Sequence, residues 1–585
     1  MNQMRPFLLV FLGAFAASMS ALGQSEETVW FDGASRSFFS RDALGESDAP
    51  DTTSARNLSE GYNLLDLNVH IAPAENLEVF AQLRVRNSFG GFFGAGTSVD
   101  VRQLRASGVI KNKVRFGVGD LYLKQSRFTL FNPDEDLSQG EGEAFRAYRD
   151  ILRYENFYEG NRWRLQGLQA DFSLQFDRTI RTLEFDGFIT RPRGSESLTN
   201  TLFIPDMLFG GGGVAAQLNQ KTRAEINWVN LFEVPASGTT YLSLRNPVLR
   251  GSVSRQGEVG DWKVDRTVQG GYSQRHWLYS QLNEAGKDSL GYTTEGVFFE
   301  WKDAWMRSDS SFQFHVGLRH VDPGFRSGGA QTRRLDLGGN VPLAVYPNYT
   351  DAVLSRPMAM FDLLASDGLY NQMLSGTLMD FNPAFSNVQP YGDATPNRQG
   401  LFFGAQGQSG DATFEYGLDG GVYREVMGQG IPDLRNFSQW ALRLTWNADR
   451  ALSWNKAASL SVAYDAEQTT RSGEEVAAVD LNRSLLHAFA NVEVAERLFV
   501  QASIKQLDAQ GREFLTERTD LGEIRTFNQV DYDLTDHILS AGMWYAFSDA
   551  VYANVQYSGW GASFAQPGAP DFNYRRLMFV FSVRI

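Results

Sequence analysis

The stretch LMFVFSVRI, residues 577–585, decides the fold. Side chains of a β-strand alternate between its two faces. One face of this stretch is entirely apolar and the other is mixed, carrying Met578, Val580, Ser582 and Arg584 opposite Leu577, Phe579, Phe581, Val583 and Ile585. A soluble sandwich seldom leaves so apolar an edge strand unprotected, because such an edge pairs with other chains. We therefore expect a strand whose apolar face contacts lipid.

The same period of two recurs along the chain with polar residues between the apolar ones. It is found at residues 79–86, 312–319, 440–447, 458–465 and 486–494. A tilted strand needs about 9–11 residues to cross a bilayer, and these stretches are close to that length. The pattern predicts membrane-crossing strands.

The connections between the expected strands alternate in length. The short ones are 72–76, 111–112, 177–178, 219–221, 409–411, 495–497 and 548–550. The long ones are 87–97, 124–160, 192–211, 233–246, 276–288, 322–399, 425–437, 468–482, 508–533 and 560–573. Short periplasmic turns and long external loops are the rule in outer-membrane barrels. A sandwich or propeller gives no reason for such an alternation.

In these features the chain resembles the porin-like β-barrels of the Gram-negative outer membrane. The resemblance implies an all-β, antiparallel, up-and-down transmembrane barrel of about 18–22 strands. Residues 28–39 suit the first strand, and residues 24–585 form one barrel in this interpretation. Closing strands of such barrels usually end on an aromatic residue, and Ile585 departs from that pattern. The aromatic-rich barrel and a leader ending before Gln24 resemble proteins of the Bacteroidetes lineage.

The first residues predict export. Arg5 precedes the apolar stretch FLLVFLGAFAAS (residues 7–18), and Ala21-Leu22-Gly23 is a small-x-small cleavage site, so residues 1–23 read as a signal peptide. The chain has no cysteine, which excludes disulfides and thiolate zinc sites. Its net charge of −14 argues against a nucleic-acid partner. We expect it in the outer membrane, in contact with lipid.

Basic side chains fall on the face that would line the lumen. They are Arg84, Arg86, Arg102, Lys113, Arg115, Arg319 and Arg443. Fixed cations in a confined pore attract anions and give the pore charge selectivity. Alternatively, these cations pair with the lumen carboxylates Asp100, Glu184, Asp186 and Glu493 and brace the wall.

Two long loops stand apart from the rest. Residues 124–160 contain a helix-like segment at 144–154, and residues 322–399 contain an amphipathic one at 357–375 with Met360, Phe361 and Leu364. Loops of this length are usually functional or disordered. An apolar helix requires burial, so these loops either fold into the lumen and constrict it, cap the surface, or dock a partner.

The sequence contains no nucleophile-elbow, zincin, Walker or Rossmann motif. His487 and Asn491 share a strand face and could support a hydrolase with a nearby serine, although polar lumen residues at that spacing are ordinary. The acidic run 134–136 could hold calcium or simply be a solvated loop. We expect no catalytic residue, cofactor or metal.

The preferred hypothesis is a porin-like channel for diffusion of small hydrophilic solutes, anions among them. A second hypothesis is a barrel plugged by its loops that serves as a docking scaffold or conduit for an outer-membrane or periplasmic protein in secretion or surface assembly. An outer-membrane enzyme and a soluble multidomain β-protein remain as further alternatives.

Overall fold

The structure is a computed structural model that describes residues 28–44, 57–89, 96–137, 140–177, 180–194, 196–197, 203–204, 206–234, 240–283, 286–331, 383–384, 386–429, 431–518, 524–564 and 572–585. The signal peptide expected at 1–23 lies outside these residues. So does the helix expected at 357–375 with Met360, Phe361 and Leu364.

The chain is built almost entirely of long strands. The first half contains β1 (Val29–Leu44), β2 (Asn57–Ala74), β3 (Leu77–Ser88), β4 (Thr97–Ile110), β5 (Val114–Leu123), β6 (Trp163–Gln175), β7 (Thr182–Arg193), β8 (Glu196–Ser197), β9 (Phe203–Ile204), β10 (Met207–Asn219), β11 (Thr222–Glu233), β12 (Thr240–Val259) and β13 (Trp262–Asn283). The second half contains β14 (Gly286–Arg307), β15 (Phe312–Val321), β16 (Arg398–Gln408), β17 (Phe414–Arg424), β18 (Asn436–Asn447), β19 (Ala458–Arg471), β20 (Val479–Ala495), β21 (Leu498–Arg518), β22 (Ile524–Ser548), β23 (Val551–Phe564) and β24 (Phe572–Arg584).

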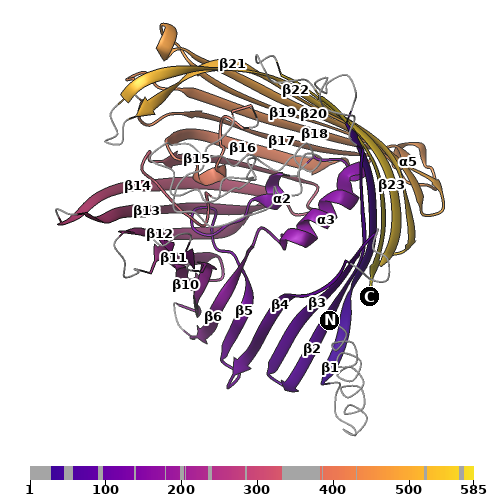
Figure 1. The fold of residues 1–585 in the computed structure, drawn as a ribbon, viewed down its shortest axis with the longest axis horizontal. Helices are drawn as coiled ribbons and strands as arrows, with labels where there is room; N and C mark the ends of the chain where they lie inside the picture. Colours follow the sequence, from indigo (N-terminus) through magenta and orange to yellow (C-terminus); the bar gives the residue numbers. More distant parts are fainter. Residues whose placement is uncertain are drawn as a thin grey trace.

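The strands close into one antiparallel barrel of 22 strands (Figure 1). Each strand pairs with its neighbours in sequence, except that β8 and β9 form a separate two-stranded sheet and β7 pairs with β10. β1 pairs with β24 to close the ring, and Gly33 and Ile585 exchange backbone hydrogen bonds of 3.2 and 2.8 Å at its end. The predicted up-and-down barrel is confirmed, with a strand number at the upper end of the expected range.

The two faces of the strands separate as the alternation predicts. On β24, Leu577 and Phe579 are exposed on the outside, whereas Met578 and Val580 are buried inside. Outward aromatic side chains gather near the short turns, among them Phe176, Phe414, Tyr416, Trp454, Tyr545 and Phe547. An apolar outer belt with an aromatic girdle around a closed barrel is the architecture of integral outer-membrane proteins, and this chain is one of them.

The connections alternate in length around the barrel, as predicted. Those on the rim that carries Ile585 are 75–76, 111–113, 176–181, 220–221, 260–261, 308–311, 409–413, 448–457, 496–497 and 549–550. Two predicted long loops are wrong, because most of 276–288 and 508–533 belongs to strands that continue past the barrel wall as paired hairpins. The longest connections, 124–162 and 322–397, leave the opposite rim.

The helices are short and lie in connections. They are α2 (Asp134–Leu137), η3 (Glu143–Phe145), α3 (Arg146–Asn156), η4 (Gly392–Ala394), α5 (Ala448–Leu452) and η5 (Glu475–Ala477). The helix expected at 144–154 is therefore present as η3 and α3. It stops at Phe157, whose left-handed backbone (φ 58°) caps it by donating to carbonyls of the last turn. Across the described ranges, no helix is both long and apolar enough to cross a membrane.

The apolar cores of the protein lie inside the barrel. The first inner core joins residues of α3, such as Tyr148 and Ile151, to inward residues of β1, β2 and β20–β24. The second inner core joins residues 128–130, 325 and 330 to inward residues of β5, β6, β10–β12 and β14. Segments of both long loops are therefore folded into the lumen, as Figure 1 shows for α2 and α3.

Candidate functional site

The connection between β5 and β6, residues 124–162, follows the inner wall of the barrel and is called the inner loop below. It begins against β14, where the rings of Phe128 and Phe298 stack with centroids 4.0 Å apart. Phe128 is fully buried, and Phe325 packs edge-on against both rings. This aromatic contact fixes the start of the inner loop inside the lumen.

The inner loop then reaches the wall formed by β18–β21. The backbone at Gly142 lies so close to β20 that an added Cβ would stand 2.7 Å from Cβ of Phe489. Glu141 accepts hydrogen bonds from Lys505 of β21 at 2.7 Å and from Arg149 at 3.1 Å. Burial disfavours the charged carboxylate, but Lys505 and Arg149 outweigh it and lower the pKa of Glu141 to about 2.

The helix α3 continues along β22–β24 and β1. Arg146 lies over the ring of Trp544 and Arg576 over the ring of Tyr148, with guanidinium-to-centroid distances of 5.5 and 5.3 Å. The inward face of the helix, with Ile151 and Leu152, is buried in the first inner core. α3 is amphipathic, and its apolar face is covered by the barrel wall.

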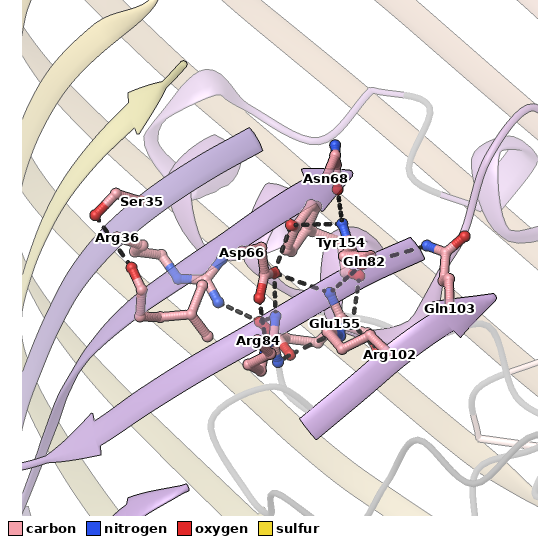
Figure 2. Close-up of polar contacts among 11 residues, drawn as sticks. Ser35, Arg36, Asp66, Asn68, Gln82, Arg84, Arg102, Gln103, Tyr154 and Glu155 are labelled. Carbon is pink, nitrogen blue, oxygen red and sulfur yellow. Dashed lines mark hydrogen bonds and ion pairs between the residues drawn. The ribbon is translucent and has the colours of Figure 1, made fainter. Parts of the chain in front are cut away.

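The end of α3 is held by a cluster of charges that we call the clamp, made of Arg36, Asp66, Arg84, Arg102, Tyr154 and Glu155 (Figure 2). Arg84 donates two parallel hydrogen bonds to Asp66 at 2.8 and 2.7 Å, and it also binds Glu155. Arg36 pairs with the same glutamate. Bidentate pairs of this kind are both strong and directional.

The remaining clamp contacts join Arg102 and Tyr154 to the same acids. Arg102 binds Asp66 at 3.2 Å and the carbonyls of Tyr154 and Glu155 at 3.2 and 3.1 Å. Burial and the hydrogen bond to Asp66 (2.5 Å) raise the pKa of the Tyr154 hydroxyl, so it stays a donor. Burial acts against the charge of Glu155, but the hydrogen bond from Arg84 and the neighbouring guanidinium groups lower its pKa.

The described parts of the connection between β15 and β16, residues 322–331 and, apart from position 385, residues 383–397, are called the second loop. Asn387 bonds to Thr469 at 2.9 Å, and its backbone N–H donates to Glu467 at 2.6 Å, so this part lies on β19. Gln331 donates to the carbonyl of Ala394 at 2.6 Å and so ties the two parts together. Within the residues described, segments of both long loops therefore lie against the inner face of the barrel.

A polar cavity of about 600 Å³ remains between the two loops and the wall of β13–β18. Its charged lining residues are Arg127, Lys302, Arg319 and Arg443, and Asp136, Glu300, Asp393 and Asp419. Arg319 binds Glu300 at 2.7 Å and Asp393 at 2.9 Å, so the second loop is held to β14 and β15 by charge. Uncharged lining groups include Gln313, Gln406, Gln439 and Tyr423.

The structure brings several of the predicted basic residues together with carboxylates. Arg84 and Arg102 belong to the clamp, Arg319 and Arg443 line the cavity, and Arg443 binds Asp419 at 2.9 Å. Arg86 lies over the ring of Tyr62 at 4.1 Å and 3.7 Å from Glu60. Arg115 binds Asp171 at 2.6 Å in an exposed pair, and Lys113 lies exposed in the turn between β4 and β5.

The predicted carboxylate partners differ from those observed. Glu184 pairs with Arg223, and Glu493 accepts backbone N–H groups of Ala457 and Arg497 in a turn. The acids observed beside the predicted basic residues are Glu60, Asp66, Glu155, Asp171, Glu300, Asp393 and Asp419. Asp66 and Glu300 occupy inward positions in alternating strands and could have been found from the pattern. Glu155 and Asp393 lie on infolded loops, whose path the alternation does not encode.

The candidate enzyme and metal residues form no recognisable centre. His487 is buried on β20 near Lys505 and Glu141, and Asn491 accepts a bond from Gln501 at 3.3 Å. Asp136 pairs with Arg127 at 2.8 Å. Over the residues whose positions are described, no group of three or more histidine, aspartate or glutamate side chains is placed to hold a metal ion.

No protein-family model and no curated protein sequence matches the chain. Solved structures align over nearly its whole length. OccK5 (OpdH) of Pseudomonas aeruginosa covers 96% of this chain and 99% of its own at 10% identity and a TM-score of 0.32. OccK11 (OpdR) of the same organism covers 96% and 97% at 9% identity and 0.34. A loop-deleted OmpT, an outer membrane protein of Vibrio cholerae, covers 95% and 100% at 8% identity and 0.27. TM-scores this low support no assignment of function.

Proposed function

We propose that the protein is a porin-like channel through which small hydrophilic solutes diffuse across the outer membrane. The observation that carries this proposal is the polar cavity inside the barrel, bounded by β13–β18 and the two infolded loops. A polar lining replaces the hydration that a solute loses on entering a narrow passage. An apolar lining would exclude such a solute.

The two loops act as the constriction in this proposal. Arg127 of the inner loop binds Asp136 at 2.8 Å and lies 3.4 Å from Asp393 of the second loop. Both loops are therefore linked to each other as well as to the wall. A constriction held by charge pairs keeps a constant width, which favours steady passage over random opening and closing.

We further propose a weak preference for anions. The cations and carboxylates of the cavity are equal in number, but they are not equally paired. Arg127, Arg319 and Arg443 bind carboxylates, whereas Lys302 makes no ion pair within the described ranges. A solute carboxylate or phosphate can therefore reach the ammonium group of Lys302 without displacing a protein acid.

Liposome swelling tests the channel proposal. Proteoliposomes holding the refolded mature chain would be diluted into isotonic solutions of neutral sugars of rising mass and of amino acids. We expect swelling that slows as the solute grows, as a pore of fixed width gives. No swelling with any solute, from liposomes in which the barrel is folded, would overturn the proposal.

A second candidate function is the plugged scaffold, and the two inner cores favour it. Apolar side chains of both loops fill part of the lumen, with Phe128, Phe145 and Phe325 fully buried. A plug needs such packing more than a diffusion channel does. The two functions differ in one measurable property, because a plugged barrel conducts only after a partner or a deletion moves the loops.

A further inference from the structure

The wall of the barrel is incompletely paired between β4 and β5. These strands share the shortest ladder between neighbours in the barrel, running from Arg105↔Gly119 to Ile110↔Val114. β4 nevertheless continues to Thr97, where β3 still pairs with it, and β5 continues to Leu123, where β6 pairs with it. From Gly119 towards Leu123, β5 is no longer paired with β4.

Gly119 is the point at which β5 leaves β4. Its backbone has φ +102°, which side-chain-bearing residues rarely adopt, and an added Cβ would lie 2.2 Å from the carbonyl oxygen of Leu104. Beyond it, Leu121 and Leu123 are buried in the second inner core. β5 therefore bends into the lumen, and among the described residues no strand pairs with the edge of β4 from Thr97 to Leu104 that faces away from β3.

The open stretch lies at the height of the hydrocarbon. The six residues of β4 that pair with β5 span about 15 Å along the membrane normal, at a strand tilt of about 40°. The unpaired stretch therefore begins about 15 Å above the periplasmic turn, within an apolar belt that is about 25 Å tall. Val99, Val101 and Leu104 point outward there and are more than half exposed. Backbone polar groups of an open sheet edge do not face lipid unless other groups satisfy them.

Side chains, rather than a strand, close this part of the wall. The backbone N–H of Leu104 donates to Asp120 at 2.7 Å, and Arg164 of β6 donates to the carbonyl of Arg102 at 2.7 Å. The ring of Phe157, at the end of α3, lies between Arg102 and Arg164, with guanidinium-to-centroid distances of 4.3 and 4.0 Å. Side chains can rotate away from such a position without breaking the barrel ladder.

We propose that this opening is a lateral port that admits amphiphiles with an anionic head group between the outer leaflet and the lumen. The apolar residues on the outer edge of β4 suit an acyl chain. On the inner side, the guanidinium groups of Arg102 and Arg164 lie on either side of Phe157. These two cations favour an anionic head group, and Phe157 is the residue that must move.

Photo-crosslinking from the membrane tests the port. The refolded mature barrel in phosphatidylcholine vesicles would be irradiated with dodecanoate that carries a terminal diazirine, and labelled peptides identified by mass spectrometry. We expect labels on residues 154–166 behind the opening as well as on lipid-facing strands. Dodecanol with the same diazirine should label 154–166 about tenfold less, because it lacks the charge-assisted contact. Labels confined to outward residues, or equal labelling by both probes, would overturn the proposal.

Two variants sharpen the test. Phe157→Ala removes the ring that fills the opening and should increase labelling of the wall behind it by about tenfold. Phe145→Ala removes a fully buried ring of the same loop that packs in the first inner core, to which neither β4 nor β5 contributes, and should leave that labelling unchanged. If both variants increase labelling equally, the inner loop has been loosened as a whole and the port is excluded. Labelling of the unaltered protein stands as a test even if a variant fails to fold.

Discussion

Nζ of Lys505, on the inner face of β21, lies 2.7 Å from a carboxylate oxygen of Glu141 in the inner loop. Both side chains are almost completely buried, and 364 positions of sequence separate them. The pair fixes the middle of the inner loop to the wall opposite the strands from which that loop leaves. Together with the clamp at the end of α3, it keeps the loop stretched around the lumen.

Acid should release the inner loop. The pKa of Glu141 is lowered from 4.5 to about 2, so its anchoring is complete above about pH 4.5 and is lost as the pH falls towards 2. We expect current noise in planar bilayers to increase over that range. Glu141→Gln should show the increased current noise already at neutral pH. Glu143 forms an exposed pair with Arg146, so Glu143→Gln should not increase the noise. Identical pH profiles for the unaltered protein and Glu141→Gln would contradict this assignment.

Breaking the clamp should cost far more stability than breaking a surface pair. Arg84→Ala leaves Asp66 fully buried with only Arg102 and Tyr154 as partners, and we expect a loss of about 3–5 kcal/mol. Arg115→Ala removes an exposed pair with Asp171 and should cost about 0–1 kcal/mol. Urea unfolding of the refolded barrel in detergent measures both. Equal losses would show that the clamp does not hold the loop.

Charge reversal in the cavity should change ion selectivity. Lys302→Glu places a carboxylate where the ammonium group of Lys302 lines the cavity, and the anion-to-cation permeability ratio should fall by a factor of about 2 to 10. Lys221→Glu makes the same change in the exposed turn between β10 and β11 and serves as the control. Reversal potentials in a salt gradient measure the ratio. An unchanged ratio in Lys302→Glu would place the ion path elsewhere in the lumen.

The orientation of the barrel can be read with single cysteines, because the native chain has none. Asp433→Cys lies in the connection between β17 and β18, and Asp549→Cys in the turn between β22 and β23; both positions are exposed. A membrane-impermeant maleimide should label position 433 on intact cells and position 549 only after the outer membrane is permeabilised. The reverse pattern would invert the topology.

The sequence predicted what period two and loop length can encode. Alternation placed Phe579 and Leu577 outside and Val580 inside, and the lengths of the connections predicted that short turns gather on one rim and long loops on the other. The partners of the basic residues could not be predicted in the same way. Glu155 meets Arg36 and Arg84 because α3 crosses the lumen, and no local pattern records that path. Asp66, an acid at an inward position between Leu65 and Leu67, was the one clamp partner visible in the pattern.

The bend at Gly119 was also missed, and for a related reason. The stretch Gly117-Val118-Gly119 follows the expected alternation, so it reads as an ordinary strand. Glycine inside a strand often marks a bulge or a close approach of another backbone. Only the register shows that pairing with β4 ends there and that β5 turns towards the second inner core.

Single-channel recording of the refolded mature protein in a planar bilayer, with a salt gradient across it, tests the central claim most directly. We predict steady open conductance at neutral pH with a mild anion preference that Lys302→Glu removes. A barrel that inserts but stays silent, and conducts only after residues 322–399 are deleted, would contradict the channel and establish the plugged scaffold in its place.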